Sequence, residues 1–357
     1  MSEKKPGMNK FLKEIHEQPA ALRDTLQYYI EGEGAALLNE FVKLIEKGTV
    51  NKVVFTGMGS SYFVSYAASL LFNSAGVFSV APNAGELLHY GYPVVDKKTL
   101  LVCISQSGES YEIKKLLETK SDGVPCAGVT NERNSTLAKM SDLVLLTKAG
   151  SEEMTSTKTY ITTQLAAYLA GWKLSGSWDG RLMSSLKDVA DVFESGLMSL
   201  PGEVEKALDF LGELNALPVI ARGPSFSTAS QSALMFKEAD KVPAFSMLGG
   251  EFRHGPMEMV QPGVKTILFA PEGRTYVQSL KMAKDIAGFG GKVLLITNGN
   301  IKLEDKNIFT IKVQGSDEFM FSITGILPLQ LMVDAYAKRM GFEAGSFSHG
   351  AKVTETE

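Results

Sequence analysis

The sequence has few of the residues that build disulfide-rich or metal-binding proteins. Its 357 residues include two cysteines, Cys103 and Cys126, and both lie in apolar, strand-like runs. Buried free thiols in a reducing compartment are the simplest interpretation of this pattern, so we expect no disulfide framework and no metal site. The chain also carries no motif that predicts a cofactor.

Long apolar runs and clustered basic charge are missing as well. No apolar stretch reaches the roughly 18 residues that a membrane-spanning helix requires, and the charged N-terminus lacks the apolar core of a signal peptide. The formal net charge is −4 and the lysines and arginines are dispersed, which argues against a surface that tracks nucleic-acid phosphates. We therefore expect a cytoplasmic protein that binds neither membrane nor nucleic acid.

Strand-like and helix-like segments alternate along the chain, and their order occurs twice. The predicted strands lie at 52–59, 99–105, 126–131 and 143–148 in the first half, and at 217–225, 266–273, 292–300 and 307–313 in the second. Long helices are predicted at 60–72, 156–174 and 227–240, and helices at 185–211 bridge the halves. Nearly equal spacing between successive strand ends indicates a duplication. The alternation predicts an α/β fold of two mostly parallel, doubly wound three-layer sandwiches.

Small polar residues gather where two strands of the first half end. The first strand runs into "GMGSS", which supplies Ser60 and Ser61, and the second runs into "SQSGES", which supplies Ser105, Gln106, Ser107 and Ser110. Ligands of doubly wound sheets bind at the carboxyl ends of the strands. Hydroxyl and amide donors just before a helix N-terminus suit an oxyanion. Since neither a Walker A lysine nor a GxGxxG motif is present, a monophosphate fits better than a nucleotide.

Helix capping alone is the other interpretation of these two loops. The second half argues against it, because the loop that corresponds to "SQSGES" reads Pro271-Glu272-Gly273 and has no hydroxyl group. A turn with a purely structural role would not need its polar atoms in one copy only. The asymmetry therefore favours a phosphate ligand in the first half.

Several longer motifs together resemble one known family. The stretches "EIHEQPAALRDTL", "GMGSSY", "SQSGES", "STKTYITTQL", "FKEAD", "GGEFRHGP" and "AKVTETE" occur in this order over nearly the whole chain. They resemble the isomerase half of glutamine:fructose-6-phosphate amidotransferase, which consists of two sugar isomerase (SIS) domains. The resemblance implies an N-terminal helical segment (1–35), a first SIS domain (36–180), a helical linker (181–209), a second SIS domain (210–347) and a C-terminal tail that enters the active site (348–357).

The resemblance also implies roles for individual residues. The serines and the glutamine named above would bind phosphate, and Ser156 would contact the sugar hydroxyls. Glu238 in "FKEAD" matches the base that moves a proton between C1 and C2, and a carboxylate in a partly dry site suits that step. His254 in "RHGP" matches the ring-opening histidine, which relatives donate from the neighbouring subunit, so a homodimer is expected. Lys352 in "GAKVT" matches the lysine that forms a Schiff base. Each of these three residues also has a purely structural interpretation. Glu238 would form an ion pair on a helix surface, His254 would be a turn residue, and Lys352 would be a solvated charge in the tail.

Two departures from the family pattern leave the reaction open. Relatives carry a lysine three residues before the catalytic glutamate, where this chain has Met235. The chain shows no glutaminase half, so we do not expect glutamine-dependent amination. We expect a phosphosugar isomerase/deaminase that converts a glucosamine 6-phosphate-like amino sugar to ketose 6-phosphate and ammonia. The alternative is a deglycase of 6-phosphorylated Amadori compounds; Lys352 favours the former and Met235 the latter.

A non-catalytic phosphosugar sensor is the alternative from another class. SIS modules of that kind serve transcription regulators, which need a DNA-binding domain. The roughly 35 residues before the first expected domain are too few for a domain of ordinary size and contain no basic recognition helix. A sensor would also have no need for Glu238, His254 and Lys352 together.

Overall fold

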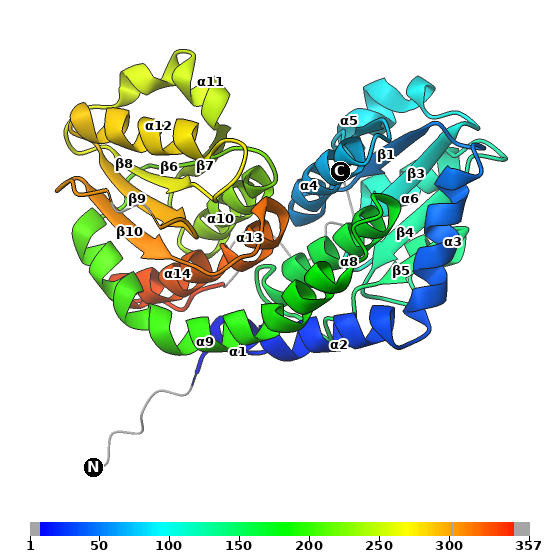
Figure 1. Ribbon diagram of the computed structural model, residues 1–357, viewed down its shortest axis with the longest axis horizontal. Coiled ribbons are helices and arrows are strands. Elements are labelled where there is room, and N and C mark those ends of the chain that lie inside the picture. The colour runs from blue at the N-terminus through cyan, green and yellow to red at the C-terminus, as the bar shows by residue number, and fades with distance from the viewer. Residues whose placement is uncertain (1–7, 301–302, 346–357) are drawn as a thin grey trace, which may run out of the picture.

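The computed structural model describes residues 8–300 and 303–345, which form two lobes that each contain one parallel sheet (Figure 1). The first sheet has the order β2-β1-β3-β4-β5. Its strands are β1 (Lys52–Thr56), β2 (Ser79–Val80), β3 (Thr99–Ile104), β4 (Cys126–Thr130) and β5 (Leu143–Leu146). The second sheet has the order β10-β9-β8-β6-β7. Its strands are β6 (Leu217–Ala221), β7 (Ala244–Leu248), β8 (Lys265–Phe269), β9 (Lys292–Thr297) and β10 (Ile308–Lys312).

The two sheets repeat one topology, which confirms the α/β fold and the duplication predicted from sequence. In each half the second strand lies on one side of the first strand and the remaining three lie on the other side. The point where the strand order reverses is therefore between β1 and β3 in the first lobe and between β6 and β8 in the second. Such a reversal leaves a crevice at the carboxyl ends of the two strands.

Each sheet carries helices on both faces. The outer face of the first sheet packs on α5 (Ala84–Glu86), the π-helix η1 (Leu87–Gly91), α6 (Tyr111–Thr119) and α7 (Thr136–Met140), and η2 (Tyr92–Val94) follows η1. The outer face of the second sheet packs on α11 (Gly249–Arg253), the 3-10 helix η3 (Pro256–Met259) and α12 (Tyr276–Gly288). Strand residues alternate between the faces: Val53 and Phe55 belong to the inner core, and Val54 belongs to the outer one. This alternation is the two-residue period of a strand buried on both sides.

The inner faces of both sheets share one continuous core (Figure 1). Between them lie α4 (Ser60–Ser74) and α8 (Lys158–Leu174) from the first lobe, and α10 (Ser225–Ala239), α13 (Glu318–Thr324) and α14 (Leu327–Met340) from the second. All residues of α8 from Lys158 to Trp172 are buried. Polar contacts also cross between the lobes: the Tyr160 and Ser227 hydroxyls lie 2.8 Å apart, and Gln164 Nε2 donates to Ser322 Oγ at 2.6 Å. The lobes are therefore packed as one unit.

Helices α1 (Lys10–His16), α2 (Gln18–Ile30) and α9 (Gly180–Leu211) run along the bottom of the two lobes in the view of Figure 1. Helix α9 contains Pro201, and α3 (Gly34–Glu46) packs on α8 and β5 of the first lobe. The buried amides of Gln18 and Gln330 exchange two hydrogen bonds of 2.8 Å and join α2 to α14. On the other lobe, Tyr29 Oη donates to the carbonyl of Leu146 at 2.8 Å.

One segment of the described chain has the length and apolarity of a membrane span. It runs from Glu318 to Met340, and 89% of its most apolar 18-residue window is buried inside the structure. It corresponds to α13 and α14, whose side chains belong to the shared core. Burial of this kind is what a central helix of a folded domain requires.

Candidate active site

The predicted phosphate residues come together at the carboxyl ends of β1 and β3. Ser60 and Ser61 open α4, and Ser105, Gln106, Ser107 and Ser110 form the loop between β3 and α6. Ser60, Ser61, Gln106 and Ser156 line one small cavity, together with Val64, Thr159, Tyr160 and Thr163. Its lining consists of hydroxyl, amide and apolar groups, and α4 points its N-terminal amides toward this edge of the sheet. A helix of 15 residues places a partial positive charge there.

The loop from Ser105 to Ser110 is organised by its own hydrogen bonds. The buried Ser105 hydroxyl accepts from the amide of Gly108 at 3.1 Å and lies 3.0 Å from the Ser110 hydroxyl. Ser107 Oγ accepts from the amide of Glu109 at 3.2 Å. Gly108 has φ +65°, and a β-carbon at this position would lie 2.2 Å from Ser135 Oγ. The loop therefore requires glycine here, both for its backbone conformation and for its packing.

The one carboxylate of this loop is paired outside the cavity, away from the hydroxyls predicted to bind phosphate. Glu109 accepts from the amide of Thr136 at 2.7 Å and from its hydroxyl at 2.9 Å, at the start of α7. The backbone hydrogen bond from Thr136 lowers the pKa of Glu109, and the hydroxyl of Thr136 and the charge of Lys114 lower it further. The negative charge is thus stabilised by partners outside the cavity.

A short segment before α8 brings Ser156 to the cavity. We call residues 152–157 the interlobe loop, because residues of both lobes hold it. The buried Glu152 carboxylate accepts from the amides of Thr157 at 2.9 Å and Thr159 at 3.2 Å. From the second lobe, Gln231 Nε2 on α10 donates to the carbonyl of Ser156 at 2.9 Å. The sequence predicted a helix from Ser156; it begins at Lys158 instead, because the preceding residues bind these side chains.

Glu238, the predicted base, reaches the same loop from the second lobe. It lies half-buried in the last turn of α10, and its Oε2 accepts a 2.8 Å hydrogen bond from the Thr155 hydroxyl. One face of α10 carries Gln231, Met235 and Glu238, because these residues are spaced by four and three positions, about one helical turn each. Met235 is fully buried, so the helical turn before Glu238 presents an apolar side chain. The structure thus places the predicted base in contact with Thr155, the residue before Ser156 of the cavity lining; Glu238 itself does not line the cavity.

The structure does not bring His254 into this cluster. It follows α11, which lies at the outer end of the second lobe in Figure 1. Its side chain is exposed and is not part of the cavity lining. Lys352 lies outside the described residues. Thr155, Gln231 and Glu152 hold the interlobe loop beside the cavity and were not predicted from the sequence; the only signal for Thr155 was its place beside Ser156.

The second lobe differs from the first at the equivalent strand end. A β-carbon on Gly273, in the loop after β8, would lie 2.3 Å from the carboxyl carbon of Glu318. Glu272 in the same loop accepts from the amide of Asn300 at 3.4 Å. Carboxylates therefore stand after β8 where hydroxyls stand after β3, and they repel a phosphate rather than bind it.

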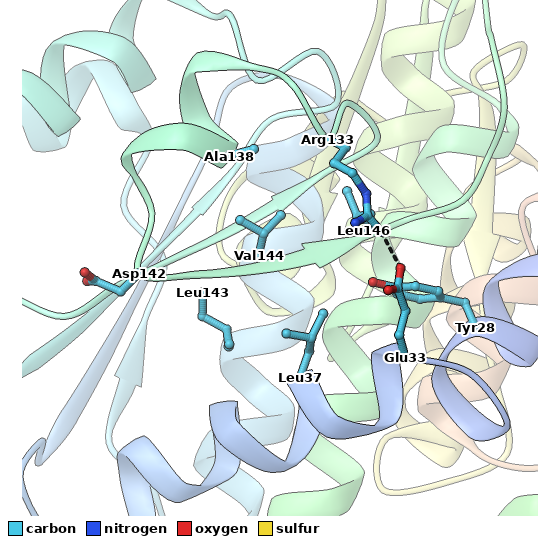
Figure 2. A pocket seen from close by; sticks show the side chains of 9 residues that line it. All are labelled: Tyr28, Glu33, Leu37, Arg133, Ala138, Asp142, Leu143, Val144 and Leu146. Carbon is cyan, nitrogen blue, oxygen red and sulfur yellow. Dashed lines mark hydrogen bonds and ion pairs between the residues drawn. The ribbon is translucent and has the colours of Figure 1, made fainter.

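A second cavity of about 390 Å³ lies at the edge of the first sheet, away from the predicted residues (Figure 2). Leu37, Leu143 and Val144 form its apolar wall, and an ion pair between Arg133 and Glu33 lies at its rim. Because it contains none of the phosphate or catalytic candidates, it is not the candidate active site.

The chain belongs to the SIS domain family, whose model matches residues 49–171 and 214–337. Among individual proteins, it is similar to the glutamine–fructose-6-phosphate aminotransferase (isomerizing) of Bartonella henselae, with 28% identity over 97% of this chain and 58% of that protein. The chain thus spans somewhat more than half the length of this curated relative.

Solved structures show the same architecture. The C-terminal domain of glucosamine-fructose-6-phosphate aminotransferase from Francisella tularensis has 25% identity and a TM-score of 0.83, and the match covers 96% of this chain and 99% of that one. A glucosamine-6-phosphate deaminase from Thermotoga maritima has 22% identity and a TM-score of 0.75, over 97% and 99% of the two chains, and shares the fold. The resemblance seen in the sequence motifs is thereby confirmed.

Proposed function

We propose that this chain is a phosphosugar isomerase/deaminase that acts on a 6-phosphorylated amino sugar. It converts a glucosamine 6-phosphate-like substrate and water to ketose 6-phosphate and ammonia. The observation that carries this proposal is the contact between Thr155 and Glu238, which brings a carboxylate of the second lobe to the residue next to Ser156 in the hydroxyl-lined cavity of the first. The membership in the SIS family supports the sugar phosphate as the substrate class.

The phosphate is bound without a cationic side chain in the cavity lining. Hydroxyls of Ser60, Ser61 and the loop from Ser105 to Ser110 donate to its oxygens, and the N-terminus of α4 supplies positive potential. Ser156 contacts the sugar hydroxyls. Anchoring the phosphate at one end of an open-chain sugar fixes the position of C1 and C2 at the other, which is how binding energy serves the reaction.

Glu238 carries out the proton transfer. It removes the proton from C2 of the open-chain amino aldose, and the electron pair forms an enolamine between C1 and C2. Return of the proton to C1, together with transfer of a proton from the amine nitrogen to O1, gives a 2-imino sugar with a C1 hydroxyl. Water then adds to this imine, and ammonia leaves to give the ketose 6-phosphate. A half-buried carboxylate is suited to this step, because partial exclusion of water strengthens its interaction with a developing charge.

Opening of the sugar ring is assigned to His254, since imidazole donates and accepts protons near neutral pH. Its exposed position in one chain fits donation to the site of a second copy, so we propose a homodimer. We also propose that Lys352 forms the imine with the open ketose, and that the reaction takes place in the cytoplasm, where the buried free thiols of Cys103 and Cys126 stay reduced.

One observation favours a second candidate function. Met235 is fully buried one turn before Glu238 and offers neither charge nor a strong hydrogen bond to an amine. A deglycase of 6-phosphorylated Amadori compounds needs only a base and ring opening. There the proton moves from C1 to C2, and hydrolysis of the resulting C1 imine yields an aldose 6-phosphate and the free amine.

A product assay separates the two functions. The purified protein is incubated with glucosamine 6-phosphate and, separately, with a fructosyl-amino acid 6-phosphate, and products are followed by phosphorus NMR. Fructose 6-phosphate and ammonia from the first substrate establish the deaminase/isomerase. Glucose 6-phosphate and free amino acid from the second establish the deglycase. Glu238→Gln is the control that shows whether turnover depends on this site. If the protein binds both compounds but converts neither, both proposed reactions are contradicted and a non-catalytic phosphosugar sensor is favoured.

A further inference from the structure

Thr155 lies where the two lobes meet in the candidate site, and neither the motifs nor the family match gives it a role. We propose that Thr155 is a positioning residue for Glu238: its hydroxyl holds Oε2, so that Oε1 faces the substrate. This inference rests on the proposed proton-transfer function of Glu238. It explains how a base on a helix of one lobe is oriented toward a sugar bound in the other.

The contact is specific in geometry and is protected from solvent. Thr155 is 2% exposed, and its hydroxyl lies 2.8 Å from Glu238 Oε2 across 83 residues of sequence. The chain is held on both sides of Thr155. Gln231 donates to the carbonyl of the next residue at 2.9 Å, and the Glu14 carboxylate accepts from the amide of the preceding one at 3.3 Å. Because the hydroxyl is buried, it cannot exchange Glu238 for a hydrogen bond to bulk water.

The proposed reaction explains why such an anchor matters. The proton leaves one carbon and returns to its neighbour on the same face of the sugar, so a single carboxylate oxygen must reach both. Anchoring the other oxygen fixes the carboxylate plane and removes rotamers that point elsewhere. A donated hydrogen bond also favours the charged form of a carboxylate, which is the form that accepts a proton. Met235, one turn earlier, has no group that could do the same.

The test compares three variants of the full chain. Thr155→Val keeps the shape and removes the hydroxyl, Thr155→Ser restores a hydroxyl, and Thr162→Val removes another buried hydroxyl that bonds only within α8. We expect Thr155→Val to lower kcat by about 10- to 100-fold with KM changed less than about 3-fold, and to shift the acidic limb of the kcat/KM pH profile upward. Thr155→Ser and Thr162→Val should stay within about 3-fold of wild type.

Two results overturn the positioning role. One is a Thr155→Val enzyme with wild-type kcat and pH profile; the other is an equal loss in Thr155→Ser, which would place the effect in the methyl group. A carbon-13 titration of the Glu238 carboxyl, assigned with Glu238→Gln, tests the contact without any substrate. If wild type turns over none of the phosphosugars, the proposed function is wrong. In that case the positioning contact is tested by the titration alone: it is supported if Thr155→Val moves the titration of the Glu238 carboxyl to higher pH, and it is refuted if the titration does not move.

Discussion

Asp240 lies two residues after Glu238, and its environment predicts an unusual dependence of stability on pH. The side chain is 5% exposed, and neither of its carboxylate oxygens has a hydrogen-bond partner among residues 8–300 and 303–345. Burial raises the pKa of Asp240 to about 8, the nearby Asp334 carboxylate adds to the rise, and Lys241 opposes it. Asp334 itself accepts from Asn9 and Lys338, so its oxygens are already engaged. Asp240 is therefore protonated in the folded protein at neutral pH.

The sign of the effect follows from the proton count in the two states. In the unfolded chain Asp240 titrates near its ordinary pKa of 3.8, whereas in the folded protein it holds its proton up to about pH 8. Between these values the folded state binds the extra proton, so the free energy of unfolding falls as pH rises. The contribution of the Asp240 proton to the free energy of unfolding is fully present below about pH 4 and is lost by about pH 8. At about 1.36 kcal/mol per unit, the change from pH 5 to pH 7.5 is about 3 kcal/mol.

Asp240→Asn removes this titration and nearly preserves the shape. We expect the free energy of unfolding of the variant, relative to wild type, to rise by about 3 kcal/mol between pH 5 and pH 7.5. Urea unfolding at both pH values, followed by circular dichroism, measures the difference. Asp122→Asn, at an exposed carboxylate, is the matched control and should show less than about 0.5 kcal/mol. A difference between wild type and Asp240→Asn that does not change with pH refutes the reasoning.

Three further predictions concern the site. Glu238→Gln should lower kcat by about 10²- to 10⁴-fold in the product assay while phosphosugar binding persists; retained turnover rules out this base. Ser105→Ala breaks the contacts with Gly108 and Ser110, and should raise the Kd for the sugar phosphate about 10-fold in calorimetry; Ser195→Ala, on the exposed face of α9, should not change the Kd. Mixing inactive Glu238→Gln and His254→Ala chains should restore activity through heterodimers; no recovery after subunit exchange excludes a shared site.

Much of the fold could be read from the sequence because apolar runs and turn residues recur at nearly equal spacing. Of the ten strands in the described part of the chain, eight were predicted, and the two that were missed, β2 and β7, lie at sheet edges. β2 has only two residues, and β7 has a partly exposed face with Phe245, so neither has the continuous apolar run of a central strand. Between the halves the sequence predicted more than one helix, whereas the structure has the single helix α9, which continues through Pro201.

The site was predictable to the extent that its residues follow strands. Ser60 and Gln106 share a cavity because β1 and β3 are neighbours, which their strand ends already indicated. The contact between Thr155 and Glu238 joins residues from different lobes, and no periodicity in the sequence encodes such a pair. Site contacts that depend on how the two halves pack become visible only in three dimensions.

The burial of nearly all of α8 has a consequence for how the two halves depend on each other. In a protein made of the first half alone, the side of α8 on which Tyr160 and Gln164 contact Ser227 of α10 and Ser322 of α13 would face water. An exposed apolar helix face of this size favours aggregation or association with another chain. We therefore expect the two halves to fold as a single unit, although their sheets repeat one topology.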